Sequence, residues 1–225
     1  MRLSCRCVNR HDDLAGAVAD VVGGLCYALL RVYQVTAAGT AGAPTVGLAE
    51  RQASFADDEY ARYVRLRSHL DSLTSDPEAA LEAFRPAVDA FYGAAAADDW
   101  TLAQVFHYVG DTITTDFADI LTSRLPEPTA SAVRDALTGR TEQEEFALDQ
   151  IRSALKDGRD AQQSIRRHTA VLVGEALNRF RDALLASNRL ETVLGGDAAV
   201  KEVVLELLGR HRERLEHLGI DTVDD

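Results

Sequence analysis

Residues 48–70 read LAERQASFADDEYARYVRLRSHL, and this stretch decides the fold class. Side chains spaced three or four residues apart lie on one face of an α-helix. The stripe with this spacing consists of Leu48, Gln52, Phe55, Glu59, Arg62 and Leu66. Its apolar members predict a helix that packs into a bundle. Its polar members predict that charged groups enter the core near the middle of this helix.

The preceding segment carries a longer stripe that is entirely apolar. Its members are Leu14, Val18, Val21, Leu25, Ala28, Val32 and Val35. Alternating steps of four and three residues are typical of a helix whose seam faces a bundle core. The stretch AAGTAGAP (residues 37–44) ends this helix, because Gly and Pro interrupt helical structure.

The rest of the chain is also helical in pattern, and the sequence has no alternating runs of β-branched residues. We expect a short helix after Asp76, inside a long connection that reaches Ala97 and lies outside the core. Further helices are expected over residues 98–125, 129–157 (with a kink at Gly139), 159–190 and 197–218. Two long helices, a crossover and two more long helices predict an all-α, ferritin-like four-helix bundle with one long crossover and additional C-terminal helices.

The sequence contains no repeat of fixed period and no low-complexity linker, so we expect a single helical domain over residues 13–218. Residues 1–12 lack periodicity and are expected to form a flexible N-terminal tail. Residues 219–225 are expected to form an acidic C-terminal tail.

The composition excludes some function classes. The chain has 225 residues, of which 46% are hydrophobic, and a net charge of −12. It is too apolar for a disordered protein and too acidic for a protein that coats nucleic acid, so no DNA partner is expected. Cys5, Cys7 and Cys26 are too few for a disulfide framework, and the close pair lacks the partners of a zinc site. A reducing, cytoplasmic location is expected.

The apolar stretch VVGGLCYALL (residues 21–30) has two interpretations, a targeting or membrane segment and a core helix. Asp20 precedes it and Arg31 ends it, so it is much shorter than the roughly 20 apolar residues of a membrane span. The acidic residues before it also differ from the basic approach of a signal peptide. We expect a core helix and no membrane association.

Three stretches resemble a known family. They are residues 48–70, DDWTLAQVFHYVGDTITTDF (residues 98–117) and HTAVLVGEALNRF (residues 168–180). They are similar to actinobacterial ferritin-like proteins near the tRNA hydroxylase-like branch of the di-iron carboxylate superfamily. The resemblance covers residues 17–186, and the pattern YVGD-x₄-DF (residues 108–117) is its most specific part. It implies a ferritin-like bundle and, in members that keep the centre, two metal ions that activate dioxygen for hydroxylation.

Such a centre uses one Glu from each of two helices and a Glu-x-x-His motif from each of the other two. The six histidines of this chain are His11, His69, His107, His168, His211 and His217. None of them has Asp or Glu three residues before it, so the motif is absent from the sequence.

The resemblance implies particular ligand positions, and this chain departs from them. Ala28 stands where the first helix would carry a Glu. Glu59 is followed by Arg62 where the second helix would carry a His, and Arg140 and Gln143 stand where the fourth would carry a carboxylate and a His. The remaining carboxylates are Glu59, Asp111, Asp116 and Glu175, which we interpret as vestigial.

Because arginine stays protonated, it cannot ligate a metal ion. We therefore expect no bound metal or other cofactor. Instead, Arg62 and Arg140 are expected to form ion pairs with Glu59, Asp116 and Glu144 and to fill the volume of the lost centre. His107 and Asp111 lie four residues apart, and a hydrogen bond on the helix surface is expected there rather than acid–base catalysis.

Two functions follow from these expectations. The first is a non-catalytic ferritin-like protein with a degenerate metal centre, kept as a module that binds an unidentified protein partner or forms a homodimer. The second is a metal-dependent oxygenase or hydroxylase of the tRNA hydroxylase-like branch, with iron at an atypical site formed by Glu59, Asp111, Asp116 and Glu175. We do not expect tRNA binding, because the basic spots at residues 166–168 and 210–214 do not form a continuous basic face.

Overall fold

The computed structural model describes residues 5–97, 99–186 and 188–219, and within them all regular structure is helical. The helices are α1 (Cys5–Gly39), η1 (Thr40–Gly42), α2 (Val46–Leu73), α3 (Pro77–Glu82), α4 (Arg85–Ala94), α5 (Trp100–Val105), the π-helical turn η2 (Phe106–Gly110), α6 (Asp111–Thr122), α7 (Thr129–Leu137), α8 (Thr141–Ala154), η3 (Leu155–Asp157), α9 (Arg159–Ala186), α10 (Arg189–Leu194) and α11 (Asp197–Leu218).

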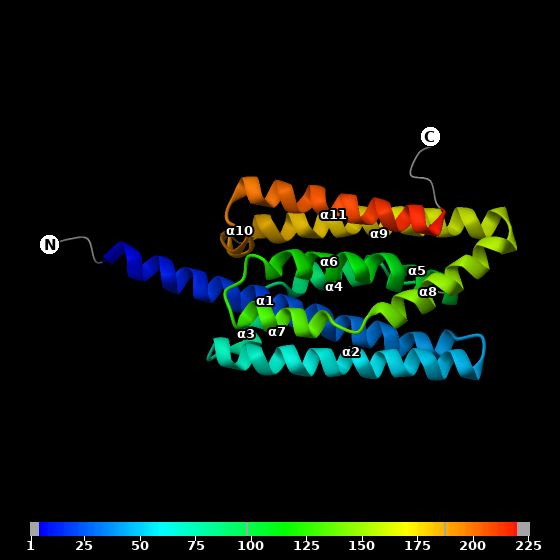
Figure 1. Cartoon of the computed structure of the whole chain (residues 1–225), viewed down its shortest axis with the longest axis horizontal. Coiled ribbons are helices and arrows are strands. Elements are labelled where there is room, and N and C mark those ends of the chain that lie inside the picture. Colours follow the sequence, from blue (N-terminus) through cyan, green and yellow to red (C-terminus); the bar gives the residue numbers. More distant parts are fainter. Residues whose placement is uncertain (1–4, 98, 187, 220–225) are drawn as a thin grey trace.

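Four helical members form a closed bundle, as the sequence predicts. Helix α1 packs along α2, α2 contacts α7, α7 contacts α6, and α6 contacts α1. The consecutive segments α5, η2 and α6 act as one long helix, and α7 and α8 together form the fourth member. Helix α9 packs against α4 and helix α11 packs against α6, on the side that faces away from α1 and α2 (Figure 1). These two helices form the appended layer. The fold is therefore an all-α, ferritin-like bundle with additional C-terminal helices.

Side-chain caps begin several of these helices where the sequence favours them. Thr45 accepts a hydrogen bond from the amide of Leu48 at the start of α2. Asp76 and Asp99 accept equivalent bonds at the starts of α3 and α5, at 3.0 and 2.8 Å. Each cap satisfies one of the four amide groups that a helix N-terminus leaves without a helical partner.

The expected crossover was wrong in one respect. It contains a second helix, α4, and this helix is part of the core because Phe91 and Tyr92 are buried. The aromatic rings of Phe91 and Tyr92 pack against each other and against Phe106 of η2. At the N-terminal end, α1 starts at Cys5, inside the segment that was expected to be a flexible tail. At the C-terminal end, α11 ends at Leu218, the expected last residue of the domain, with Gly219 as its cap. Residues 1–4 and 220–225 lie outside the described part of the chain.

The fourth bundle member is two helices rather than one kinked helix. Gly139 has a φ of 77°, in the left-handed region that side chains with a Cβ disfavour. Helix α7 ends just before Gly139, and α8 starts at Thr141 with Arg140 as its N-cap residue. The break therefore decides where the Arg140 side chain enters the core.

At two glycines, neighbouring atoms leave no space for a side chain. A Cβ atom at Gly23 of α1 would lie 2.3 Å from the carbonyl oxygen of Ala80, which fixes the close approach of α3. A Cβ atom at Gly110 would lie 2.8 Å from the ring of Phe106. Neither position has room for a methyl group.

Helix α1 meets the length and hydropathy criteria for a membrane span over Asp13–Gly42, with a mean hydropathy of 1.6. In its most apolar window, however, 61% of the residues are buried inside the bundle. The same apolar seam, including Val18, Val21 and Leu25, belongs to the main hydrophobic core. Burial in the bundle accounts for the apolar character of this helix, as expected.

Candidate functional site

Charged side chains from three parts of the chain meet inside the four-helix bundle. Helix α2 supplies Glu59 and Arg62, which lie three residues apart on its core face. Asp111 follows the π-helical turn η2, and Arg140 lies at the break between α7 and α8. We call these four residues the arginine–carboxylate network.

Arg140 is the centre of the network. Its Nη2 atom lies 2.6 Å from Oε2 of Glu59, and its Nη1 atom lies 2.8 Å from Oδ2 of Asp111. Nη1 also donates to the hydroxyl of Thr115 at 2.8 Å. The planar guanidinium therefore bridges carboxylates from two different helices, a geometry that suits arginine because its donors form a rigid fork.

Arg62 supports the network from the α2 side. Its Nη1 atom lies 3.1 Å from Oε1 of Glu59. Its Nε and Nη2 atoms donate to the carbonyl oxygens of Thr138 and Gly139, at 3.2 and 2.7 Å. These carbonyls follow the last turn of α7, so Arg62 connects α2 to the break that positions Arg140.

The network lies in the protein interior, where two guanidinium groups face two carboxyl groups. All four side chains are at most 6% exposed. Burial raises the pKa of Glu59 to about 7, although Arg140 opposes this effect. Burial also lowers the pKa of Arg140, but Asp111 and Glu59 outweigh it and the pKa lies above its ordinary value. Burial lowers the pKa of Arg62, with Glu59 opposing this effect. Because arginine stays protonated in proteins, both arginines are cations that need the two carboxylates.

The donor set does not fit a di-iron centre. The position between Glu59 and Asp111, where two carboxylates would share a metal ion, holds the guanidinium of Arg140. The space left beside Ala28, Asp111 and Arg140 is about 20 Å³, enough for about one water molecule. Among the described residues, no group of three or more His, Cys, Asp or Glu side chains is arranged to hold a metal ion.

Two predicted pairings were wrong. Asp116 pairs with Arg214 and Arg210 of α11, with its closest contact at 2.6 Å, rather than with Arg62 or Arg140. It lies five residues after Asp111 and faces the appended layer, whereas Asp111 faces the core. Glu144 forms no ion pair with Arg140 in the described part of the chain, and burial raises the pKa of Glu144, with Arg214 and, more weakly, Arg140 opposing this effect.

The other predicted positions have separate surroundings. Glu175 lies on α9 and pairs with Arg179 at 3.3 Å, so it does not join Glu59 and Asp111. Gln143 is buried on α8. Ala28 is buried on α1, and its carbonyl accepts a hydrogen bond from the hydroxyl of Tyr92 at 3.3 Å.

A second, uncharged polar cluster adjoins the network. His107 is 3% exposed, and its Nε2 atom lies 3.0 Å from the amide nitrogen of Gln52. The amide of Gln104 donates to Gln52 at 3.4 Å. Burial lowers the pKa of His107 to about 4, so its imidazole is neutral near pH 7. The expected surface hydrogen bond with Asp111 was wrong, because both residues are buried and Asp111 pairs with Arg140.

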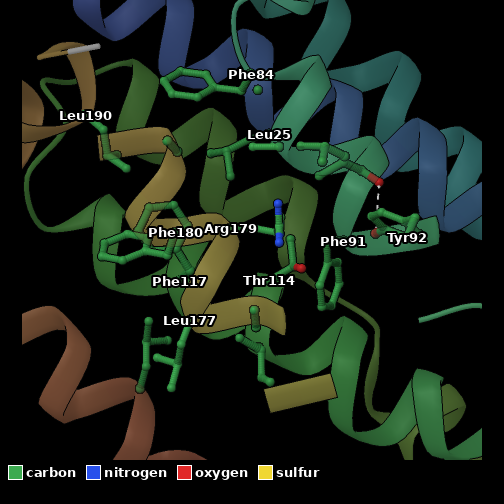
Figure 2. A pocket seen from close by; sticks show the side chains of 18 of the residues that line it. Leu25, Phe84, Phe91, Tyr92, Thr114, Phe117, Leu177, Arg179, Phe180 and Leu190 are labelled. Atoms are coloured by element: carbon green, nitrogen blue, oxygen red, sulfur yellow. Dashed lines mark hydrogen bonds between the residues drawn. The ribbon is translucent and has the colours of Figure 1, made fainter. Parts of the chain in front are cut away.

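A pocket of about 170 Å³ lies between α1, α4, α6 and the C-terminal helices. Figure 2 shows its wall, in which Phe84, Phe91, Phe117 and Phe180 surround the more polar Arg179. The wall is mainly apolar, and the pocket is partly open to solvent. This pocket is not among the sites predicted from the sequence. The only sequence signal is a set of small residues on the helix faces that meet there, namely Gly24, Ala28, Ala87, Ala176 and Ala183.

The comparisons with known proteins agree with this architecture. No curated protein matches the chain. A family model described as a ferritin-like domain of actinomycetes matches residues 12–197, which include most of α1, the other three bundle members and the whole of α9 and α10. On this match the chain belongs to the actinomycete ferritin-like domain family.

Proposed function

We propose that this chain is a non-catalytic member of its family, in which the arginine–carboxylate network takes the place of a di-iron centre. On this proposal it derives from the tRNA hydroxylase-like branch and serves in the cytoplasm as a helical interaction module. The observation that carries the proposal is the position of Arg140, bridged between Glu59 and Asp111 at 2.6 and 2.8 Å.

Electrostatics supports this assignment. Two guanidinium groups already balance the two buried carboxylates of the network. Adding two divalent cations would place four further positive charges beside Arg62 and Arg140, in an interior where charge repulsion is weakly screened. Metal binding would therefore require both arginines to leave the core, where each has several polar contacts.

The oxygenase alternative needs Glu59, Asp111, Asp116 and Glu175 around one site. The network contains only the first two. Asp116 forms ion pairs with Arg214 and Arg210 of α11. Glu175 of α9 forms an ion pair with Arg179, which also lies on α9. No observation on this chain favours the atypical metal site over the ion pairs.

The basic residues of α11 also support the view that tRNA is not a partner. Arg210 contacts Asp116, Asp119 and Glu206, and Arg214 contacts Asp116. These arginines hold α11 against α6. Phosphate contacts would have to compete with the carboxylates that already bind them.

An exposed apolar face on α2 supports the interaction role. Tyr60 and Val64 lie four residues apart and are 45% and 47% exposed. The ring of Tyr60 packs against Tyr33 of α1 at 5.0 Å, so the face extends over both helices.

A homodimer through this face is the partner arrangement we propose, and light scattering of the Tyr60→Ser, Val64→Ser variant tests it. Loss of dimer supports it, and an unchanged mass contradicts it.

Metal analysis tests the main proposal. The full chain is produced in medium supplemented with iron, manganese and zinc, and its metal content is measured by mass spectrometry. Far less than one metal ion per chain is expected, together with no dioxygen consumption after addition of ferrous iron. Two bound metal ions per chain would overturn the proposal.

A further inference from the structure

The apolar pocket is separate from the arginine–carboxylate network and has space for a ligand. Its volume is about 170 Å³, and small residues such as Gly24, Ala176 and Ala183 leave this space between the helices. Apolar cavities of about 150 Å³ bind molecules as large as benzene. The pocket is also partly open to solvent, which gives a ligand a route of entry.

Two side chains of the apolar wall each carry a buried nitrogen atom that forms no hydrogen bond. His211 of α11 lines the pocket and is 8% exposed, and its Nδ1 atom has no hydrogen bond. The buried Nε atom of Arg179 likewise has no hydrogen-bond partner. Figure 2 shows Arg179 and Thr114 inside the ring of apolar side chains. Buried polar groups normally find a partner, so these atoms point to a ligand with a polar atom.

The charges around the pocket do not favour an anionic ligand. The guanidinium of Arg179 is already paired with Glu175 at 3.3 Å and Asp182 at 2.9 Å. Burial lowers the pKa of His211 to about 4, with Arg214 adding to this effect and Asp116 opposing it, so His211 is neutral near pH 7. A carboxylate in the pocket would find no cation to pair with, because Arg179 is already paired and His211 is neutral. It would also lie near the carboxylates of Glu175 and Asp182. Burial of such a charge is unfavourable.

We propose that this pocket binds an uncharged, mainly hydrocarbon molecule of about six to eight carbon atoms that carries a hydroxyl or carbonyl oxygen. The hydrocarbon part contacts the aromatic and aliphatic wall. The oxygen accepts a hydrogen bond from Nε of Arg179, and a hydroxyl also donates to a neighbouring acceptor such as the imidazole of His211. The inference does not depend on the proposed loss of the metal centre, because no residue of the network supplies these contacts.

Calorimetric titration of the full chain with 1-octanol and with sodium octanoate at pH 7.5 tests the proposal. We expect saturable binding of one octanol molecule per chain, at least tenfold tighter than octanoate. Ala176→Phe fills the pocket and is expected to weaken octanol binding at least tenfold. Ala183→Leu is a second blocking variant, one that adds less volume. Circular dichroism confirms that each variant is folded.

The control is Leu205→Phe, which enlarges an exposed side chain of α11 that does not line the pocket. It is expected to bind octanol as the unmodified chain does. His211→Phe removes the imidazole that accepts from the octanol hydroxyl, and a threefold or greater loss of octanol affinity is expected. An unchanged affinity would overturn the assignment of that hydrogen bond. Absence of saturable binding, equal affinity for octanol and octanoate, or unchanged binding in both folded blocking variants would overturn the proposal.

Discussion

The Nη2 atom of Arg140 lies 2.6 Å from the Oε2 atom of Glu59, although 81 residues separate them along the chain. Arg140 also reaches Asp111, 29 residues earlier. One guanidinium thus joins α2, α6 and the α7–α8 break. Its removal would leave two buried carboxylates with only Arg62 nearby, so the stability of the bundle core depends on this contact.

Replacement of Arg140 by alanine is expected to lower the free energy of unfolding by about 3–5 kcal/mol, because the carboxylates lose their bridging cation. Urea denaturation measures this change. Arg134→Ala on α7 is the control, since Arg134 is 55% exposed and lies 3.9 Å from Glu127 at the surface. Its effect is expected to be below about 1 kcal/mol. Equal effects of the two variants would show that the network does not stabilise the core.

Arg62→Ala separates the arginine network from a hidden metal site. The variant loses the ion pair with Glu59 and both hydrogen bonds to the α7 terminus, so its melting temperature is expected to fall. Its metal content is expected to stay as low as that of the unmodified chain. A stoichiometric gain of iron or manganese in this variant would show that the carboxylates can still form a metal site.

The close approach of α1 and α3 can be tested at Gly23. A Cβ atom there would lie 2.3 Å from the Ala80 carbonyl oxygen, so Gly23→Ala is expected to destabilise the protein by about 2 kcal/mol or more. Gly174→Ala in α9 is the matched control, because its Cβ atom meets no other atom within 4 Å. It is expected to raise stability by about 0.5–1 kcal/mol through helix propensity. A neutral Gly23→Ala variant would contradict the packing described above.

The buried imidazole of His107 predicts a pH dependence. Its pKa is lowered from 6.5 to about 4 in the folded state, so between these values the unfolded chain binds more protons than the folded one. Stability from this group is therefore complete above pH 6.5 and decreases as the pH falls towards 4, by roughly 3 kcal/mol in total.

Urea denaturation of the unmodified chain and of His107→Gln at several pH values checks this prediction. Other groups titrate in both proteins, so the difference between the two curves isolates the histidine. The stability gap between the two proteins is expected to shift in favour of the variant as the pH decreases from 6.5 to 4. A constant gap would mean that His107 is protonated in the folded state or accessible to water.

Much of the fold follows from residue spacing within single helices. The stripe of α1 predicts a core-facing helix, and its members from Val18 to Val32 are buried, whereas Leu14 at its start is 37% exposed. The stripe of α2 predicts that Glu59 and Arg62 enter the core, and both are buried. The break between α7 and α8 was anticipated only as a kink. The left-handed backbone at Gly139 depends on the approach of α2, which is not a local property of the sequence.

Residue spacing alone indicates that the chain is helical, that charged residues enter the core face of α2, and that no histidine has the spacing of a di-iron ligand. The packing of the helices determines that Arg140 pairs with Asp111 rather than with Asp116, and that Glu175 lies elsewhere. It also created the apolar pocket, whose walls come from separate helices. The reason is that spacing along one helix defines which side chains share a face, whereas the partner of that face depends on how distant helices pack.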